Sequence, residues 1–224
     1  MMAVKVVGLG GIGSALVRPL ARYLNYRGER ATVTLIDGDS YEPKNRDRQI
    51  FADLGNKASV TAYELAQEFE GVSFRAVKDY VHVGNVGRVI ADGDLVFLAV
   101  DNHATRKLVS DYCQRLRQVT LVSGGNELTD GHVQVYVRRD ASDVTPPLTH
   151  LHPEIESPQD HSPAELSCDD LVESEPQLIF TNLAVASAML EAFYALDQGQ
   201  LNYSESYIDI LTGWKRPVMR KEVR

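Results

Sequence analysis

A glycine-rich turn between an apolar run and a helical segment constrains the fold of this chain more than any other feature. Its glycines are Gly8, Gly10, Gly11 and Gly13. Residues 4–9 lead into the turn as an apolar run, and residues 14–26 follow it with helical character. A second apolar run over 31–36 ends at Asp37, so residues 4–37 have the length of one βαβ unit. Such a unit predicts parallel strands joined by a right-handed crossover.

Strands and helices are predicted to alternate along the residues that follow this unit. Apolar residues at helical spacing predict helices over 57–69 and 104–117. Strands are predicted over 72–77, 94–100, 119–122 and 133–137. This alternation indicates an α/β fold, a Rossmann-like doubly wound and mostly parallel sheet with an antiparallel extension and flanking helices.

The chain is expected to form one domain over residues 1–224. Residues 1–139 form its core, and residues 140–175 form a Pro-rich crossover loop of a length that is usually functional or disordered. Residues 176–224 complete the domain. They hold a helix and a strand before a basic tail, at 177–196 and 203–211.

Composition argues against several classes of partner. The net charge of -8 argues against electrostatic binding to nucleic acid or to an anionic membrane, because both require clustered Lys and Arg. The two cysteines, Cys113 and Cys168, are too few for a disulfide framework, which favours a reducing, cytoplasmic setting. No stretch approaches the ~20 apolar residues of a transmembrane helix, so no membrane partner is expected.

The glycine turn and Asp37 together predict a nucleotide site. Glycines let the backbone N–H groups at a helix N-terminus approach phosphates closely. Asp37 lies 24 positions after Gly13, which suits a carboxylate that binds ribose hydroxyls. An NAD-binding oxidoreductase is an alternative, because such an enzyme would require only the glycine turn and Asp37. In that alternative Arg48, Lys57 and Asp101, which come later in the chain, would have no assigned role.

Further motifs follow Asp37 in a fixed order. They are Asp37-Gly38-Asp39, Asn45-x-x-Arg48-Gln49, a lysine at Lys57, and Asp101-Asn102-x-x-x-Arg106. Over residues 4–137 their order and spacing resemble the ThiF/MoeB/ubiquitin-activating family. The resemblance implies an adenylyltransferase that uses ATP and Mg²⁺ to activate a carboxylate as an acyl-adenylate and releases pyrophosphate.

The resemblance also implies a role for each motif residue. Arg48 and Lys57 would bind the β and γ phosphates, with neutral hydrogen bonds from Asn45 and Gln49. Asp101 would hold magnesium beside the α-phosphate. The other residues assigned to the nucleotide site are Asp39, Asn102 and Arg106.

Several charged residues have a second interpretation. Asp101 precedes a predicted helix, so it can instead act as the N-cap of that helix. Arg106 can be a surface arginine of the same helix. Lys44 and Arg46 are interpreted as solvated loop charges rather than as phosphate ligands.

The expected substrate is the C-terminal carboxylate of a small ubiquitin-like or sulfur-carrier protein, or of a peptide.

A homodimer is expected from the resemblance, and the apolar helix over 177–196 packs either on its own core or on a second subunit. A non-catalytic module that keeps the fold is a further alternative. The retained Arg48, Lys57 and Asp101 argue against that module.

The chain differs from the family in two features: the cysteine pairs that bind zinc and an arginine near the N-terminus. It contains no Cys-x-x-Cys pair, so zinc bound by such pairs is not expected, and His150, His152 and His161 are interpreted as scattered loop residues. Bacterial members place an arginine from an N-terminal helix in the partner's site. Here a strand begins near the N-terminus, so two alternatives follow: another cation, such as Arg18 or Arg22 of a neighbouring subunit, substitutes, or the activity is weakened.

Cys168 lies in the predicted crossover loop and has two interpretations. In relatives, a cysteine beyond the core accepts the acyl group or takes part in sulfur transfer. The neighbouring Glu165, Asp169 and Asp170 would raise the pKa of the Cys168 thiol and disfavour the thiolate. The second interpretation is therefore that Cys168 is an incidental or packing residue with no role in the chemistry.

Overall fold

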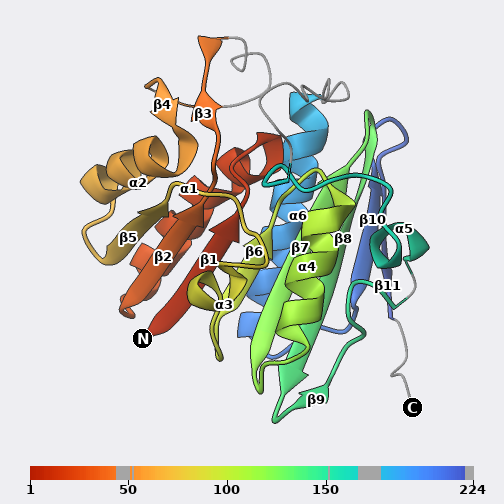
Figure 1. Cartoon of the computed structure of the whole chain (residues 1–224). Helices are drawn as coiled ribbons and strands as arrows, with labels where there is room; N and C mark the ends of the chain where they lie inside the picture. The colour runs from red at the N-terminus through yellow and green to blue at the C-terminus, as the bar shows by residue number, and fades with distance from the viewer. Residues whose placement is uncertain (44–50, 52, 151, 166–177, 220–224) are drawn as a thin grey trace.

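A mixed sheet with helices on both faces forms the described part of the chain (Figure 1). The computed structural model describes residues 1–43, 51, 53–150, 152–165 and 178–219. The strands of the large sheet are β1 (Met2–Val7), β2 (Ala31–Ile36), β5 (Val72–Val77), β6 (Leu95–Leu98), β7 (Val119–Asn126), β8 (Asp130–Arg139), β9 (Ser142–Asp143), β10 (Glu205–Asp209) and β11 (Trp214–Val218). A small separate sheet joins β3 (Ser40–Tyr41) and β4 (Gly55–Asn56). The helices are α1 (Gly11–Arg27), α2 (Lys57–Glu68), α3 (Val86–Val89), α4 (His103–Cys113), α5 (Pro153–Glu156) and α6 (Ile179–Asp197).

The large sheet is parallel in one half and antiparallel in the other. Its strand order is β11-β10-β8-β7-β6-β1-β2-β5, with β9 paired to β8. Strands β5, β2, β1, β6 and β7 run parallel, whereas β8, β10 and β11 add antiparallel pairs. The residues of β6 are buried throughout because helices cover both faces of the parallel half. The predicted doubly wound, mostly parallel sheet with an antiparallel extension is confirmed.

Apolar cores lie on both faces of the sheet. On one face, α1, α2 and α6 pack against strand residues that include Val6 and Val33. On the other face, α3, α4 and α5 cover residues that include Val7 and Tyr136. Val6 and Val7 belong to different cores because successive side chains of a strand point to opposite faces. Figure 1 shows α4 in front of the sheet and α6 behind it.

The ends of β7 and α4 differ from those predicted for reasons that the structure shows. Strand β7 continues through Gly124, where the sequence predicted a strand end. A Cβ on Gly124 would lie 2.3 Å from the Met189 sulfur, so this glycine allows α6 to pack closely on the strand. Helix α4 ends at Cys113 rather than at Arg117, because the Asp92 carboxylate accepts the Arg117 backbone N–H at 2.6 Å in a turn.

Ordered structure also occurs where a loop and a tail were predicted. Part of the predicted crossover loop forms β9 and α5, and Leu148 and Ile155 are buried there against the sheet. The residues interpreted as a basic tail include β11, which pairs with β10. The sequence shows no periodic pattern of apolar residues for α5 or for β11. Helix α5 has only four residues, and β11 is mostly exposed.

Helix α6 corrects the expectation about apolar stretches. It has 19 residues and a mean hydropathy of 1.5 in its most apolar window, which suffices by length and composition to cross a membrane. About half of that window is buried in the fold, where α6 packs against α1, β7 and β8. Core helices meet the same criterion, so the finding is weak evidence for a membrane span.

Candidate functional site

The glycine turn joins the end of β1 to the N-terminus of α1. Gly8 has a φ of +88°, and a Cβ there would lie 2.7 Å from the Ala99 carbonyl oxygen. A Cβ on Gly13 would lie 1.9 Å from the Gly8 carbonyl oxygen, so the turn closes only with glycine at both positions. Gly10 faces open space and occupies the N-cap position of α1. Because glycine has no side chain, the cap residue leaves the first-turn N–H groups available to an anion.

Asp37 braces the glycine turn from the end of β2. Its Oδ2 accepts the Leu9 backbone N–H at 2.6 Å, and its Oδ1 accepts the Asp39 backbone N–H at 2.8 Å. The residue is only 6% exposed. Burial raises the pKa of the Asp37 carboxyl, and the ammonium of Lys57 opposes that shift. The structure thus turns both Asp37 oxygens toward the backbone, although the sequence predicted a contact to ribose.

Asp39 is the more exposed carboxylate of the same motif, with half of its side chain accessible. The Lys57 ammonium donates to Asp39 Oδ2 at 3.0 Å, and the Lys57 backbone N–H donates to the Asp39 carbonyl at 2.8 Å. Asn56 caps α2 by accepting the Ser59 N–H at 3.1 Å. Asn56 also donates to the Asp37 and Asp39 carbonyls, so the start of α2 holds Lys57 beside the motif.

Tyr80 is a residue of this site that the motif analysis missed. Its hydroxyl donates to the second oxygen of Asp39. Burial, followed by this bond to Asp39, raises the pKa of the Tyr80 hydroxyl and keeps it protonated as a donor. The available signal was its place in the loop that follows β5, at the edge of a parallel sheet where ligands bind.

Asp101 and Asn102 follow β6 and precede α4. The Asn102 side chain caps α4 by accepting the Thr105 N–H at 2.8 Å, so the interpretation of Asp101 as the N-cap is wrong. Asp160 accepts the His103 and Ala104 N–H groups at 2.6 and 2.9 Å. The Asp101 side chain is exposed and is not needed to begin the helix.

Arg106 points inward and is 3% exposed, which contradicts its interpretation as a surface arginine. Its guanidinium donates to Ser123 Oγ at 2.7 Å, to the Val100 carbonyl at 2.5 Å and to the Gly124 carbonyl at 2.8 Å. Burial lowers the pKa of Arg106 to about 10, and the nearby carboxylate of Asp101 opposes the shift. These contacts join the end of β6 to β7, so Arg106 is a buried residue that fixes the backbone beneath the site.

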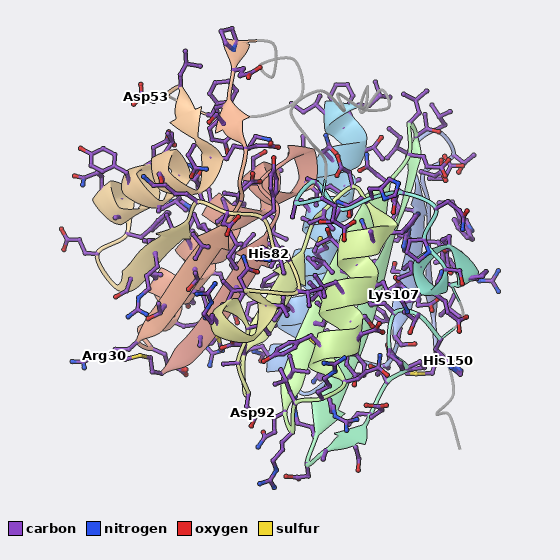
Figure 2. The ribbon with its side chains drawn as sticks, viewed as in Figure 1. Arg30, Asp53, His82, Asp92, Lys107 and His150 are labelled. Carbon is purple, nitrogen blue, oxygen red and sulfur yellow. The ribbon has the colours of Figure 1, made fainter. Side chains whose placement is uncertain are left out.

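The predicted groups therefore meet at one edge of the sheet. The glycine turn follows β1, the Asp39–Lys57 pair follows β2, and Asp101 follows β6, three strands adjacent in the sheet. In Figure 2, Asp53 marks the end of the molecule that carries this edge, and Arg30 and Asp92 mark the opposite end. The predicted residues Asn45, Arg48, Gln49 and Cys168 lie outside the described residues, as do Lys44 and Arg46.

No cluster of three or more His, Cys, Asp or Glu side chains arranged for a metal ion occurs among the described residues. Asp101 therefore belongs to no such cluster within the described part of the chain. Magnesium is commonly bound by one or two carboxylates together with substrate phosphates and water. The residues present fit that type of site rather than a cage made wholly of protein.

The interpretation of His152 as a scattered loop residue is wrong. Its Nδ1 lies 2.9 Å from Glu154 Oε1, and its Nε2 lies 3.2 Å from Glu205 Oε1. The ring also stacks on His132, with ring centroids 5.9 Å apart. The hydrogen bond to Glu205 raises the pKa of His152, whereas burial lowers the pKa of His132 to about 4. This cluster ties the segment around α5 to β8 and β10.

Arg18 and Arg22 form ion pairs within their own chain. Arg18 pairs with Glu64 at 3.2 Å and also with Glu68, and Arg22 pairs with Glu68 at 2.7 Å. These contacts join α1 to α2. Entry of either arginine into a neighbouring subunit's site would compete with them.

Solved structures share this fold over nearly the whole chain. The structure of Escherichia coli MccB with ATP covers 99% of this chain and 65% of its own, with a TM-score of 0.68 and 19% identity. The structure of PaaA also covers 99% of this chain and 65% of its own, with a TM-score of 0.71 and 16% identity. At these identities the likeness shows the fold alone.

Curated relatives match a shorter region. The adenylyltransferase and sulfurtransferase MOCS3 of Drosophila ananassae is 35% identical over 141 residues, which are 60% of this chain and 29% of that protein. The SAMP-activating enzyme E1 of Haloferax volcanii is 33% identical over 138 residues, 60% of this chain and 49% of that protein. The chain thus spans less than a third of the first relative and about half of the second. The ThiF family model matches residues 1–204, from β1 to the residue before β10, and the chain belongs to the ThiF family, as the order of its motifs predicted.

Proposed function

We propose that this chain is an adenylyltransferase that binds ATP at the carboxyl edge of the sheet and joins a carboxylate to AMP, with release of pyrophosphate. The observation that carries the proposal is the convergence of the glycine turn, the Asp39–Lys57 pair and Asp101 at the ends of three adjacent strands. Family membership supports it, and the matched relatives are named as adenylyltransferases or as an activating enzyme.

The glycine turn fits a phosphate group. Gly10 leaves open space beside the N-terminus of α1, where N–H groups and the positive end of the helix dipole favour an anion. The bond from the Lys57 ammonium to Asp39 holds this cation at the same edge of the sheet. In the proposed complex, Lys57 exchanges Asp39 for phosphate oxygens, and Arg48 assists it as the family resemblance implies.

Asp101 is proposed to hold magnesium together with the nucleotide. The ion would supply positive charge where negative charge develops on the phosphate oxygens. The exposed side chain of Asp101 supports this role, because Asn102 and Asp160 supply the cap of α4. The chain's own contribution is to fix this carboxylate at the end of a buried strand, beside the turn that receives the phosphates.

The proposed acyl substrate is the C-terminal carboxylate of a small ubiquitin-like or sulfur-carrier protein, or of a peptide. Support comes from the relatives, one named as an adenylyltransferase and sulfurtransferase and another as SAMP-activating. One solved MccB structure contains the MccA partner together with AMPCPP. The role of the sheet edge is to hold the carboxylate and the α-phosphate in line, which replaces a bimolecular encounter by an oriented one.

A cytoplasmic homodimer completes the proposal. Exposed apolar side chains on α6 support self-association, since Phe180, Leu183 and Tyr194 are 69%, 43% and 54% exposed. The measurement is light scattering coupled to size exclusion, with Leu183→Glu as the variant expected to shift the mass toward the monomer. An unchanged monomeric mass for both proteins would contradict the homodimer.

Titration calorimetry with Mg-ATP and with NAD tests the central proposal. We expect ATP to bind and NAD to bind far more weakly, because Lys57 and Asp101 serve a triphosphate and its metal. Tight NAD binding without a response to ATP would instead favour an oxidoreductase. ATP–pyrophosphate exchange with candidate peptides, each with a free or an amidated C-terminus, then separates an enzyme from a module that binds nucleotide without catalysis.

A further inference from the structure

The loop from β5 to α3 has a fixed conformation at Tyr80. Asn85 is 4% exposed and ends this loop at the N-cap position of α3. Its Nδ2 donates to the Tyr80 carbonyl at 2.8 Å, and its Oδ1 accepts the His82 N–H at 2.9 Å. His82, labelled in Figure 2, lies centrally in that view. The buried amide thus holds the backbone from which the Tyr80 side chain projects.

The Tyr80 side chain spans from β5 to the end of β2. A Cβ on Gly38 would lie 2.7 Å from Tyr80 Cδ2 and Cε2, so the ring packs directly on the Gly38 backbone. Its hydroxyl donates to Asp39 Oδ1, while the Lys57 ammonium donates to Oδ2 at 3.0 Å. One carboxylate is therefore oriented by a neutral donor on one oxygen and by a cation on the other.

Strand order places a bound nucleoside next to Tyr80. Strands β1, β2 and β5 are neighbours in that order. A phosphate at the glycine turn lies at the end of β1, and ribose hydroxyls held by Asp39 lie at the end of β2. Continuing in the same direction, the base reaches the end of β5, where Tyr80 projects.

We propose that Tyr80 is a positioning residue that orients the Asp39 carboxylate for the ribose hydroxyls and borders the nucleoside part of the nucleotide. The inference rests on the proposed ATP site and adds the residue that serves its nucleoside end. When Lys57 turns to the phosphates, the Tyr80 hydroxyl continues to donate to Asp39 Oδ1 and holds that side of the carboxylate. The phosphate end does not depend on Tyr80.

Two ligand probes separate these ends of the site. Calorimetry measures AMP and inorganic tripolyphosphate binding to the wild-type chain and to Tyr80→Phe, which retains the ring on Gly38. We expect the AMP dissociation constant to rise about tenfold, the effect of losing one hydrogen bond to a charged group. Tripolyphosphate binding and the melting temperature should stay unchanged. Tyr23→Phe is the matched control, because the half-buried Tyr23 also donates to a carboxylate, Asp197, at 2.8 Å on the remote α1–α6 contact.

Equal or tighter AMP binding by Tyr80→Phe would overturn the inference while leaving the proposed function intact. So would an equal loss of affinity for both probes, because that result indicates a general structural effect. A wild-type chain that binds neither AMP nor tripolyphosphate would overturn the proposed nucleotide site and this inference together. The selective loss of AMP affinity, absent in Tyr23→Phe, would support it.

Discussion

Asp160 closes the N-terminus of the helix that begins at His103, with its Oδ2 2.6 Å from the His103 backbone nitrogen. The two residues are 57 positions apart, so a segment of the predicted crossover loop completes a helix of the core. Asp160→Ala removes the acceptor for two backbone N–H groups. We expect the free energy of unfolding to fall by about 1–2 kcal/mol, as for a lost helix cap. Urea denaturation measures this loss, and Asp160→Asn, which retains an acceptor, should lose less.

Asp101→Asn should separate catalysis from stability. The side chain is exposed and does not cap α4, so the melting temperature should match that of the wild-type chain. Removing the charge that attracts magnesium should lower ATP–pyrophosphate exchange by at least about 10²-fold, the scale of losing one electrostatic contact to a transition state. A variant that melts normally and exchanges at the wild-type rate would remove Asp101 from the proposed mechanism.

Arg106→Lys should destabilise the fold, although it conserves the charge. A lysine ammonium cannot reproduce the planar fork that reaches Ser123, Val100 and Gly124 together. Loss of these buried bonds should cost about 2 kcal/mol or more in urea denaturation. Full stability combined with weakened ATP binding would instead identify Arg106 as a phosphate ligand.

Gly11 and Asn182 should behave as a coupled pair. A Cβ on Gly11 would lie 2.0 Å from Asn182 Nδ2, so Gly11→Ala should cost about 1–3 kcal/mol through overpacking. Asn182 is fully buried, and its polar side-chain atoms have no hydrogen-bond partner in the described structure. Asn182→Ala should therefore recover much of the loss in the double variant. Additive effects in this double-mutant cycle would contradict direct contact.

Stability should depend on pH through two stacked histidines whose pKa values are shifted in opposite directions. Glu205 raises the pKa of His152 above 6.5, so its contribution is complete below pH 6.5 and is lost as the pH rises through the raised value. Burial lowers the pKa of His132 to about 4, so its contribution is complete above pH 6.5 and is lost as the pH falls toward about 4.

Urea titrations from about pH 4 to about pH 9 measure both contributions. His152→Gln should flatten the alkaline limb relative to the wild-type curve, and His132→Gln should flatten the acid limb. The difference between wild type and variant isolates each group from the carboxylates that titrate in the same range. Parallel curves for wild type and variant would show that the residue does not titrate in the way described.

The βαβ unit from β1 to β2 could be predicted because apolar runs and a glycine turn leave a pattern in adjacent residues. The direction of the Asp37 side chain could not be predicted, since it depends on N–H groups of Leu9 and Asp39. Tyr80 and Asp160 were missed for a related reason. Each acts as a single side chain on residues 41 or 57 positions away, and no local period records such a contact.

Strand β11 determines how the sheet ends. All but its last residue are exposed, and the strand carries Lys215, Arg216 and Pro217. Proline has no N–H to donate to a further strand, and two adjacent cations disfavour close approach of a second basic strand. Pairing of a further strand from another copy is therefore disfavoured at this edge, so of the two edge strands of the large sheet, β11 and β5, it is β11 that carries its own protection against sheet growth.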